Sequence, residues 1–154
     1  MSQDISAKSD TVKLLTFRLG DEEYSLDIMC VREIRGWTKA TPMPCAPNFM
    51  RGVINLRGTV LPVMDLAERL GLPPRAHCDR NVIIVVSHED RMTGLLVDAV
   101  SDIIALSDSD LQPPPDASSH GVPAIIKSLT LFEDRMIRVL DLPIVVTVAQ
   151  GEAA

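Results

Sequence analysis

The sequence predicts an all-β protein with short helices, built as two small five-stranded β-barrels packed together. Three observations support this class. The 154 residues are 46% hydrophobic but only 3% aromatic, so the apolar content is mainly Val, Ile, Leu and Met, and β-branched residues favour strands. Apolar residues alternate with period two in several segments that turn signals separate. Finally, parts of the second half repeat parts of the first.

The first hairpin is expected in "LLTFRLGDEEYSLDI", where two alternating runs flank the turn "GDEE". In the first run Leu15, Phe17 and Leu19 are expected on one face of the strand, and Thr16 and Arg18 on the other. The spacing then changes to three in "DIMCVREI", which fits a helical turn or a twisted strand.

After the proline-rich segment "TPMPCAPN", two short strands are expected at about Gly52–Leu56 and Thr59–Met64, bent around Arg57 and Gly58. Pro62 has no amide hydrogen and therefore belongs at a sheet edge or a bulge. "DLAERLG" predicts a short helix, with Asp65 as its N-cap and Glu68 completing a capping box.

The second half predicts strands in "NVIIVV", "MTGLLVDAV" and "SDIIAL". The stretch "SDSDLQPPPDASSHG" is predicted to be a loop, because three consecutive prolines exclude helix and central strand. A last hairpin is expected in "AIIKSLTLFEDRMIRVLDL", turning at Glu133 and Asp134.

The repeat has two offsets. Shifted by 69 positions, residues 24–34 align with 93–103, and shifted by 76, residues 53–66 align with 129–142, both of these ending in Val-x-Asp-Leu. The proline-rich loop absorbs the difference of seven residues. Two similar lobes packed face to face would share a seam that both of them line.

Charge and composition exclude several classes. The net charge of −6 and the absence of a Lys/Arg run argue against nucleic acid as a partner. No apolar run approaches 18 residues, so no membrane insertion is expected and the protein is predicted to be cytoplasmic. Cys30, Cys45 and Cys78 match no metal-binding spacing and are interpreted as buried, reduced thiols.

No catalytic constellation is found. His77, His88 and His120 fall in predicted turns or loops, outside any motif for nucleophilic, phosphate or zinc chemistry. We therefore expect no enzymatic activity, no cofactor and no metal. A small metal- or ligand-binding β-protein remains an alternative class, because His77, Cys78 and His88 could in principle meet around zinc.

Arg57 has three interpretations: a solvated turn residue, an ion-pair partner of an acid such as Glu33, or a donor fork at the edge of a binding groove. Val31 and Ile34 favour the groove, because their three-residue spacing would bring them together in a helical turn. Their simpler interpretation is core.

The motifs "GDEEYSLDI…VREIRG", "RGVINLRGTVLPVMDL" and "GLLVDAVSDI" occur in the order typical of the CheW family of bacterial chemotaxis adaptors, which the chain resembles from about residue 13 to 142. The resemblance implies two SH3-like five-stranded barrels. One CheW-like domain is expected at 12–148 with a lobe boundary near 72–82, and the polar, aperiodic N-terminal residues and the last residues are expected to form tails at 1–11 and 149–154. The resemblance leaves open an exchange of strands between the lobes.

The resemblance also implies a non-enzymatic adaptor that couples the cytoplasmic helical hairpin of a chemoreceptor to the regulatory domain of the histidine kinase CheA. Recruitment to receptor arrays at the inner face of the membrane, and ring assembly with CheA, would follow. Residues that match the family motif predict a receptor face made of Val31, Glu33, Ile34, Gly52, Arg57, Gly94 and Val100. An adaptor of a non-flagellar pathway, for surface motility or second-messenger control, is the alternative.

The chain departs from the family pattern at its C-terminal end. After "VLDL" the family usually continues into a helix rich in Glu, Lys and Leu, whereas this chain has "PIVVTVAQ". Pro143 is acceptable in a first helical turn, but the Val-Val-Thr-Val run favours a strand.

Overall fold

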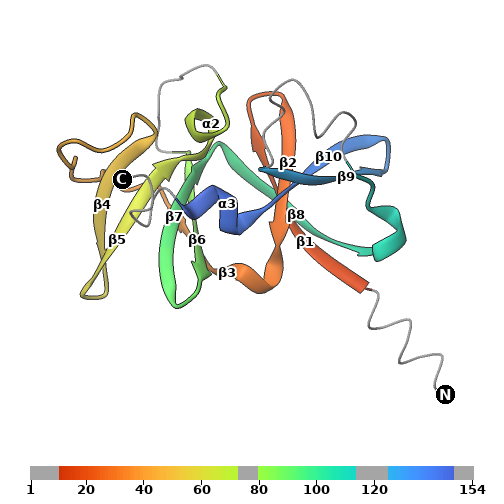
Figure 1. Ribbon diagram of the computed structural model, residues 1–154, viewed down its shortest axis with the longest axis horizontal. Helices are drawn as coiled ribbons and strands as arrows, with labels where there is room; N and C mark the ends of the chain where they lie inside the picture. Colours follow the sequence, from red (N-terminus) through yellow and green to blue (C-terminus); the bar gives the residue numbers. More distant parts are fainter. Residues whose placement is uncertain (1–10, 73–79, 114–124, 148–154) are drawn as a thin grey trace.

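The structure, a computed structural model, describes residues 11–72, 80–113 and 125–147. It contains two five-stranded sheets, ordered β8-β1-β2-β10-β9 and β3-β6-β7-β5-β4, which lie side by side (Figure 1). The predicted all-β class with short helices and two small barrels is confirmed. The first sheet consists of β1 (Thr11–Leu19), β2 (Glu22–Asp27), β8 (Ala99–Ser107), β9 (Ile126–Phe132) and β10 (Arg135–Leu140). The second consists of β3 (Val31–Gly36), β4 (Met50–Leu56), β5 (Thr59–Asp65), β6 (Val82–His88) and β7 (Arg91–Val97).

In the described ranges, four short helical segments connect or follow the strands: η1 (Ile28–Cys30), α2 (Leu66–Arg69), η2 (Asp108–Asp110) and α3 (Leu142–Thr147). None of the helices in the described ranges is long and apolar enough to cross a bilayer. The predicted tails and most of the predicted lobe boundary lie outside the described residues, as do His77, Cys78 and His120, although β1 already begins at Thr11.

The two sheets repeat each other strand for strand, with the register that the sequence offsets predict. Leu15 pairs with Leu26 between β1 and β2, and 69 residues later Ile84 pairs with Leu95 between β6 and β7. The parallel pairs agree with both offsets. Ser25 pairs with Val139 in the first sheet, and their counterparts Gly94, at an offset of 69, and Val63, at an offset of 76, pair in the second. β3 and β8 each join the sheet opposite to that of the strand before them, so the two sheets exchange equivalent strands.

Each sheet is also closed along one edge by the same device. Thr41, in the loop after β3, pairs with Val53 on the outer edge of β4 through two backbone hydrogen bonds of 2.8 and 2.9 Å. Gln112 pairs in the same way with Leu129 on the outer edge of β9, at 2.9 and 2.8 Å. These bridges satisfy backbone groups that an open sheet edge would leave exposed.

A large apolar cluster lies between the sheets and includes Phe17 from β1 and Ile84 from β6. Helix α3 packs into it with Val145 and Val146, which are fully buried. The strand favoured by the valine run is therefore wrong. β-propensity is weak and depends on packing, and here burial of one helical face and hydrogen bonds from Arg69 to the carbonyl oxygens of Ile144 and Val145 stabilise a helix.

Most local predictions are confirmed, and the exceptions involve polar side chains. Asp65 caps α2 by accepting from the amide of Glu68, but the Glu68 carboxylate contacts Arg51 instead of completing a capping box. Thr16, expected on the polar face, is fully buried and donates to Asp102. Cys45, expected to be buried, is exposed.

Residues 28–34 combine the two conformations that the sequence left open, because the η1 turn is followed directly by β3. The predicted sheet edge or bulge at Pro62 is wrong, because Pro62 lies in β5, which has neighbouring strands on both sides. The ladder with β7 begins only at Val63, so at Pro62 the missing amide hydrogen breaks no bond to that strand.

Candidate functional site

Arg57 occupies the tip of the β4–β5 hairpin. Arg57 and Gly58 have φ of 50° and 86°, so both central residues of this two-residue turn are left-handed, as hairpin turns that match strand twist require. The side-chain oxygen of Asn55 accepts from the Gly58 amide at 2.8 Å and fixes the turn. The turn therefore holds the Arg57 side chain at a defined place beyond the ends of the strands.

The Arg57 guanidinium reaches across to β3, where its Nη2 lies 2.5 Å from Oε1 of Glu33. The predicted ion pair is thus present. Hydrogen bonding from Arg57 lowers the pKa of the Glu33 carboxyl, with a further contribution from Arg35, whose Nη1 lies 3.4 Å from Oε2. The Arg57 side chain remains 68% exposed, so the pair sits at the surface and leaves other guanidinium donors accessible.

The aliphatic residues of the predicted receptor face lie along β3 and β8. A bulge between Val31 and Glu33 shifts the register, so that Val31 lies opposite Val86 and Ile34 opposite Ile84. Both partners belong to the cluster between the sheets, and the bulge therefore puts Val31 and Ile34 on one side of the strand. The shared side thus comes from a bulged strand and not from a helical turn.

The depth of these residues differs. Val31 and Val100 are partly buried at the margin of the cluster between the sheets. Ile34 is 47% exposed. Its counterpart at an offset of 69, Ile103, is 58% exposed and occupies the equivalent register, opposite Leu15. Ile103 was missing from the predicted face, although the repeat already aligned it with Ile34.

The two glycines of the predicted face are buried and serve the chain's own packing. A Cβ at Gly52, where φ is +131°, would overlap the backbone carbonyl of Thr41. A Cβ at Gly94 would lie 2.9 Å from Cγ2 of Ile83 and 3.3 Å from Cγ2 of Val63. The close neighbour at Gly52 is thus backbone of this chain, and the close neighbours at Gly94 are side chains of the same sheet.

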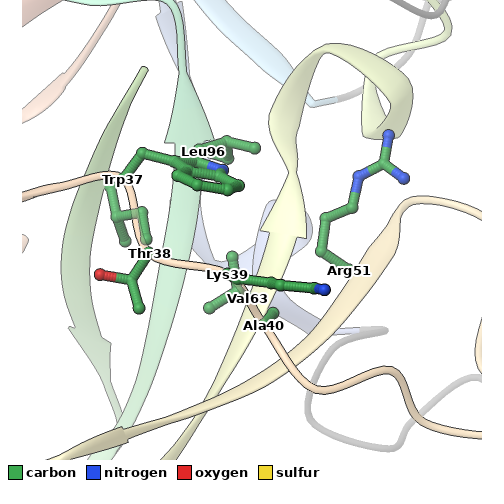
Figure 2. Close-up of a pocket in the computed structure, with 8 residues that line it drawn as sticks. Trp37, Thr38, Lys39, Ala40, Arg51, Val63 and Leu96 are labelled. Atoms are coloured by element: carbon green, nitrogen blue, oxygen red, sulfur yellow. The ribbon is translucent and has the colours of Figure 1, made fainter. Parts of the chain in front are cut away.

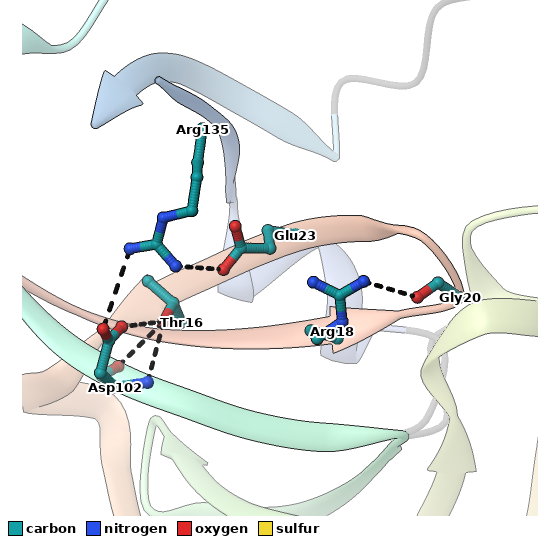
Figure 3. Close-up of polar contacts among 6 residues, drawn as sticks. All are labelled: Thr16, Arg18, Gly20, Glu23, Asp102 and Arg135. Atoms are coloured by element: carbon teal, nitrogen blue, oxygen red, sulfur yellow. Dashed lines mark hydrogen bonds and ion pairs between the residues drawn. The ribbon is translucent and has the colours of Figure 1, made fainter. Parts of the chain in front are cut away.

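A second polar cluster occurs in the first sheet (Figure 3). Arg135, at the start of β10, has its Nη1 2.9 Å from Oε2 of Glu23 and its Nη2 3.8 Å from Oδ2 of Asp102. Asp102 also accepts from the Thr16 hydroxyl at 2.6 Å. Because Asp102 is the counterpart of Glu33, both sheets use an arginine near a hairpin turn to hold an acid on an edge strand.

Two parts of the predicted face are therefore formed in the structure. Glu33 and Arg57 make an ion pair, and Val31 and Val100 both pack against the cluster between the sheets. Within the ranges that the structure describes, no three His, Cys, Asp or Glu side chains gather in a way that could hold a metal ion. The arrangement offers one guanidinium and exposed aliphatic surface, which suit contact with another protein.

Comparisons with known proteins give the same picture. A family model described as CheW-like domain matches residues 13–150. The chain is 49% identical over 142 residues to Chemotaxis protein CheW of Rhizobium meliloti (strain 1021), covering 92% of both. It is 29% identical over 115 residues to Protein FrzA of Myxococcus xanthus, covering 73% of this chain and 72% of that protein.

Among solved structures, the scaffolding protein TtCheW from Thermoanaerobacter tengcongensis superposes with a TM-score of 0.82 at 33% identity, covering 92% of this chain and 96% of that one. Sequence, strand topology and three-dimensional similarity agree, and the chain belongs to the CheW family.

Proposed function

We propose that the protein is a non-enzymatic chemotaxis adaptor that couples the cytoplasmic helical tips of chemoreceptors to the histidine kinase CheA. Membership of the CheW family supports this function. The observation that carries the receptor contact is the largely exposed guanidinium of Arg57, held on Glu33 next to partly exposed aliphatic residues of β3.

The proposed contact has an apolar part and a polar part. An amphipathic receptor helix would place aliphatic side chains against Val31, Ile34 and Val100, as helices do in apolar grooves. Arg57 would donate to polar groups or carbonyl oxygens at the helix surface, since Glu33 occupies only part of its donor fork. Gly52 and Gly94 would act indirectly, by keeping β4, β5 and β7 packed as the contact requires.

A pull-down of the full chain by a receptor cytoplasmic fragment tests this contact. Arg57→Gln is expected to weaken binding several-fold while leaving the melting temperature nearly unchanged, because exposed ion pairs add little to stability. Arg80→Gln is the matched control, since Arg80 is exposed and precedes β6, whose first residue, Val82, pairs with Gly36 at the end of β3 remote from Val31. Unchanged receptor binding with a large loss of stability would show that Arg57 is structural only.

Reconstitution with receptor fragment and kinase tests the coupling itself. We expect the protein to raise receptor-dependent phosphorylation by CheA and to sediment with both partners, as a ring or array component at the inner face of the membrane. An unchanged kinase output and no co-sedimentation would refute the proposed function.

Similarity to Protein FrzA favours one alternative, an adaptor of a chemosensory pathway that does not control flagella. The two candidates would share the same contact chemistry and differ in their partners. Pull-downs with receptor fragments and kinases from each chemosensory gene cluster of the source organism would separate them, since binding should be strongest within one cluster.

A further inference from the structure

A pocket of about 150 Å³ lies at one side of the second sheet, beneath the loop that follows β3. Its floor is apolar and consists of Val63, Ile83 and Leu96, which are buried. Trp37 forms one wall, with its ring beside Leu96 (Figure 2). The pocket shares none of the residues of the predicted receptor face and is independent of the proposed function.

The opposite side of the pocket carries two cationic side chains, Lys39 and Arg51 (Figure 2). Lys39 is exposed, and within the described ranges no ion pair engages its ammonium group. Arg51 uses Nη2 to contact Asp65 at 3.1 Å and Glu68 at 2.5 Å. Its Nε is buried and has no hydrogen-bond partner.

A buried N–H without a partner is unfavourable, and an acceptor placed beside it would remove that cost. Asp65 and Glu68 together carry one more charge than Arg51, so the charges of these three groups and Lys39 sum to zero. Lys39 is therefore the cation of this lining that no carboxylate in the described ranges engages, and a single negative charge on the occupant would find it unpaired.

The repeat shows that this combination is not a by-product of the fold. The counterpart of Trp37 in the first sheet is Leu106, which is buried in a core cluster. The counterpart of Lys39 is Asp108, an acid. Only the second sheet therefore combines an indole wall with a cation at this position.

We propose that the pocket binds a small organic carboxylate, with an aromatic or branched aliphatic body of about the size of benzoate. An apolar protein cavity of roughly 150 Å³ is large enough to bind benzene. The body would contact Trp37 and the apolar floor, and the carboxylate would accept from Lys39, whereas the buried Nε of Arg51 would donate to it only after the Arg51 side chain turns toward the pocket. A bare phosphate fits less well, because burying it against Val63, Ile83 and Leu96 would strip its hydration without replacing it.

Trp37 is the only tryptophan of the chain, so its fluorescence and its indole N–H resonance report on the pocket directly. The full chain would be titrated with benzoate, benzyl alcohol and benzylammonium. We expect a saturable response to benzoate, a much weaker one to benzyl alcohol and none to benzylammonium. Lys39→Gln should weaken benzoate binding roughly tenfold, the equivalent of one charge-assisted hydrogen bond. The control Lys13→Gln, on β1, should change nothing.

Ala40→Leu provides a second test, because it fills the pocket without changing charge. It should abolish the benzoate response while the circular dichroism spectrum stays that of the parent. Equal binding of benzoate and benzyl alcohol, full affinity in Lys39→Gln, an intact response in Ala40→Leu, or no response to benzoate would each overturn the proposal.

Discussion

Replacing Gly52 by alanine should destabilise the protein strongly, although the change adds only one methyl group. At φ of +131° a side chain is strained, which costs about 1–3 kcal/mol. The new Cβ would also overlap the carbonyl of Thr41 and disrupt the two hydrogen bonds between Thr41 and Val53, at about 0.5–1.5 kcal/mol each. The sum, about 2–6 kcal/mol, is a large part of the roughly 5–15 kcal/mol that stabilises a typical domain.

Urea denaturation of the full chain measures this loss, and Gly58→Ala is the matched control. Gly58 also has a positive φ, of +86°, but a Cβ there would meet nothing within 4 Å, so only the conformational cost of about 1–2 kcal/mol is expected. If both variants lose the same free energy of unfolding within about 0.5 kcal/mol, the overlap with Thr41 is unimportant and the reasoning is refuted.

Three further predictions follow from single residues. Arg57→Gln should raise the pKa of the Glu33 carboxyl toward its ordinary value, and carboxyl NMR can follow this titration. In the parent protein the stabilisation from the ion pair is present at neutral pH and is lost as the pH falls through the lowered pKa of Glu33. Burial raises the pKa of Tyr24, the only tyrosine, so tyrosinate absorbance should stay absent above pH 10 until the protein unfolds. Val145→Ala should cost about 2 kcal/mol in urea denaturation, because Val145 is fully buried; an unchanged midpoint would show that α3 is not part of the core.

The strands, the turns and the repeat could be predicted from the sequence because they depend on local or periodic signals. Alternation placed Leu15, Phe17 and Leu19 in the core, and the positive-φ turn at Glu133 and Asp134 fell where predicted. Polar side chains were less predictable. Burial of Thr16 is possible because Asp102, 86 residues away, accepts a hydrogen bond from its hydroxyl. A local sequence pattern cannot predict so distant a partner.

The candidate site shows the same division. The sequence singled out Arg57 and Glu33 and suggested that they form an ion pair, which the structure contains. It also grouped Val31 with Ile34 because they are three residues apart, and the bulge in β3 puts residues at that spacing on one side of the strand. It did not show that Gly52 and Gly94 are buried, or that Ile103 is exposed as the counterpart of Ile34.

The sequence by itself determined the class of fold, the duplicated order of strands and the position of the arginine turn, because hydrophobic periodicity and turn residues are local properties of the chain. Only the tertiary structure decided the exchange of β3 and β8, the helical state of Val145 and Val146 and the unpaired Nε of Arg51. Those features depend on which distant groups meet, and a contact between distant groups stabilises only once the whole chain has brought them together.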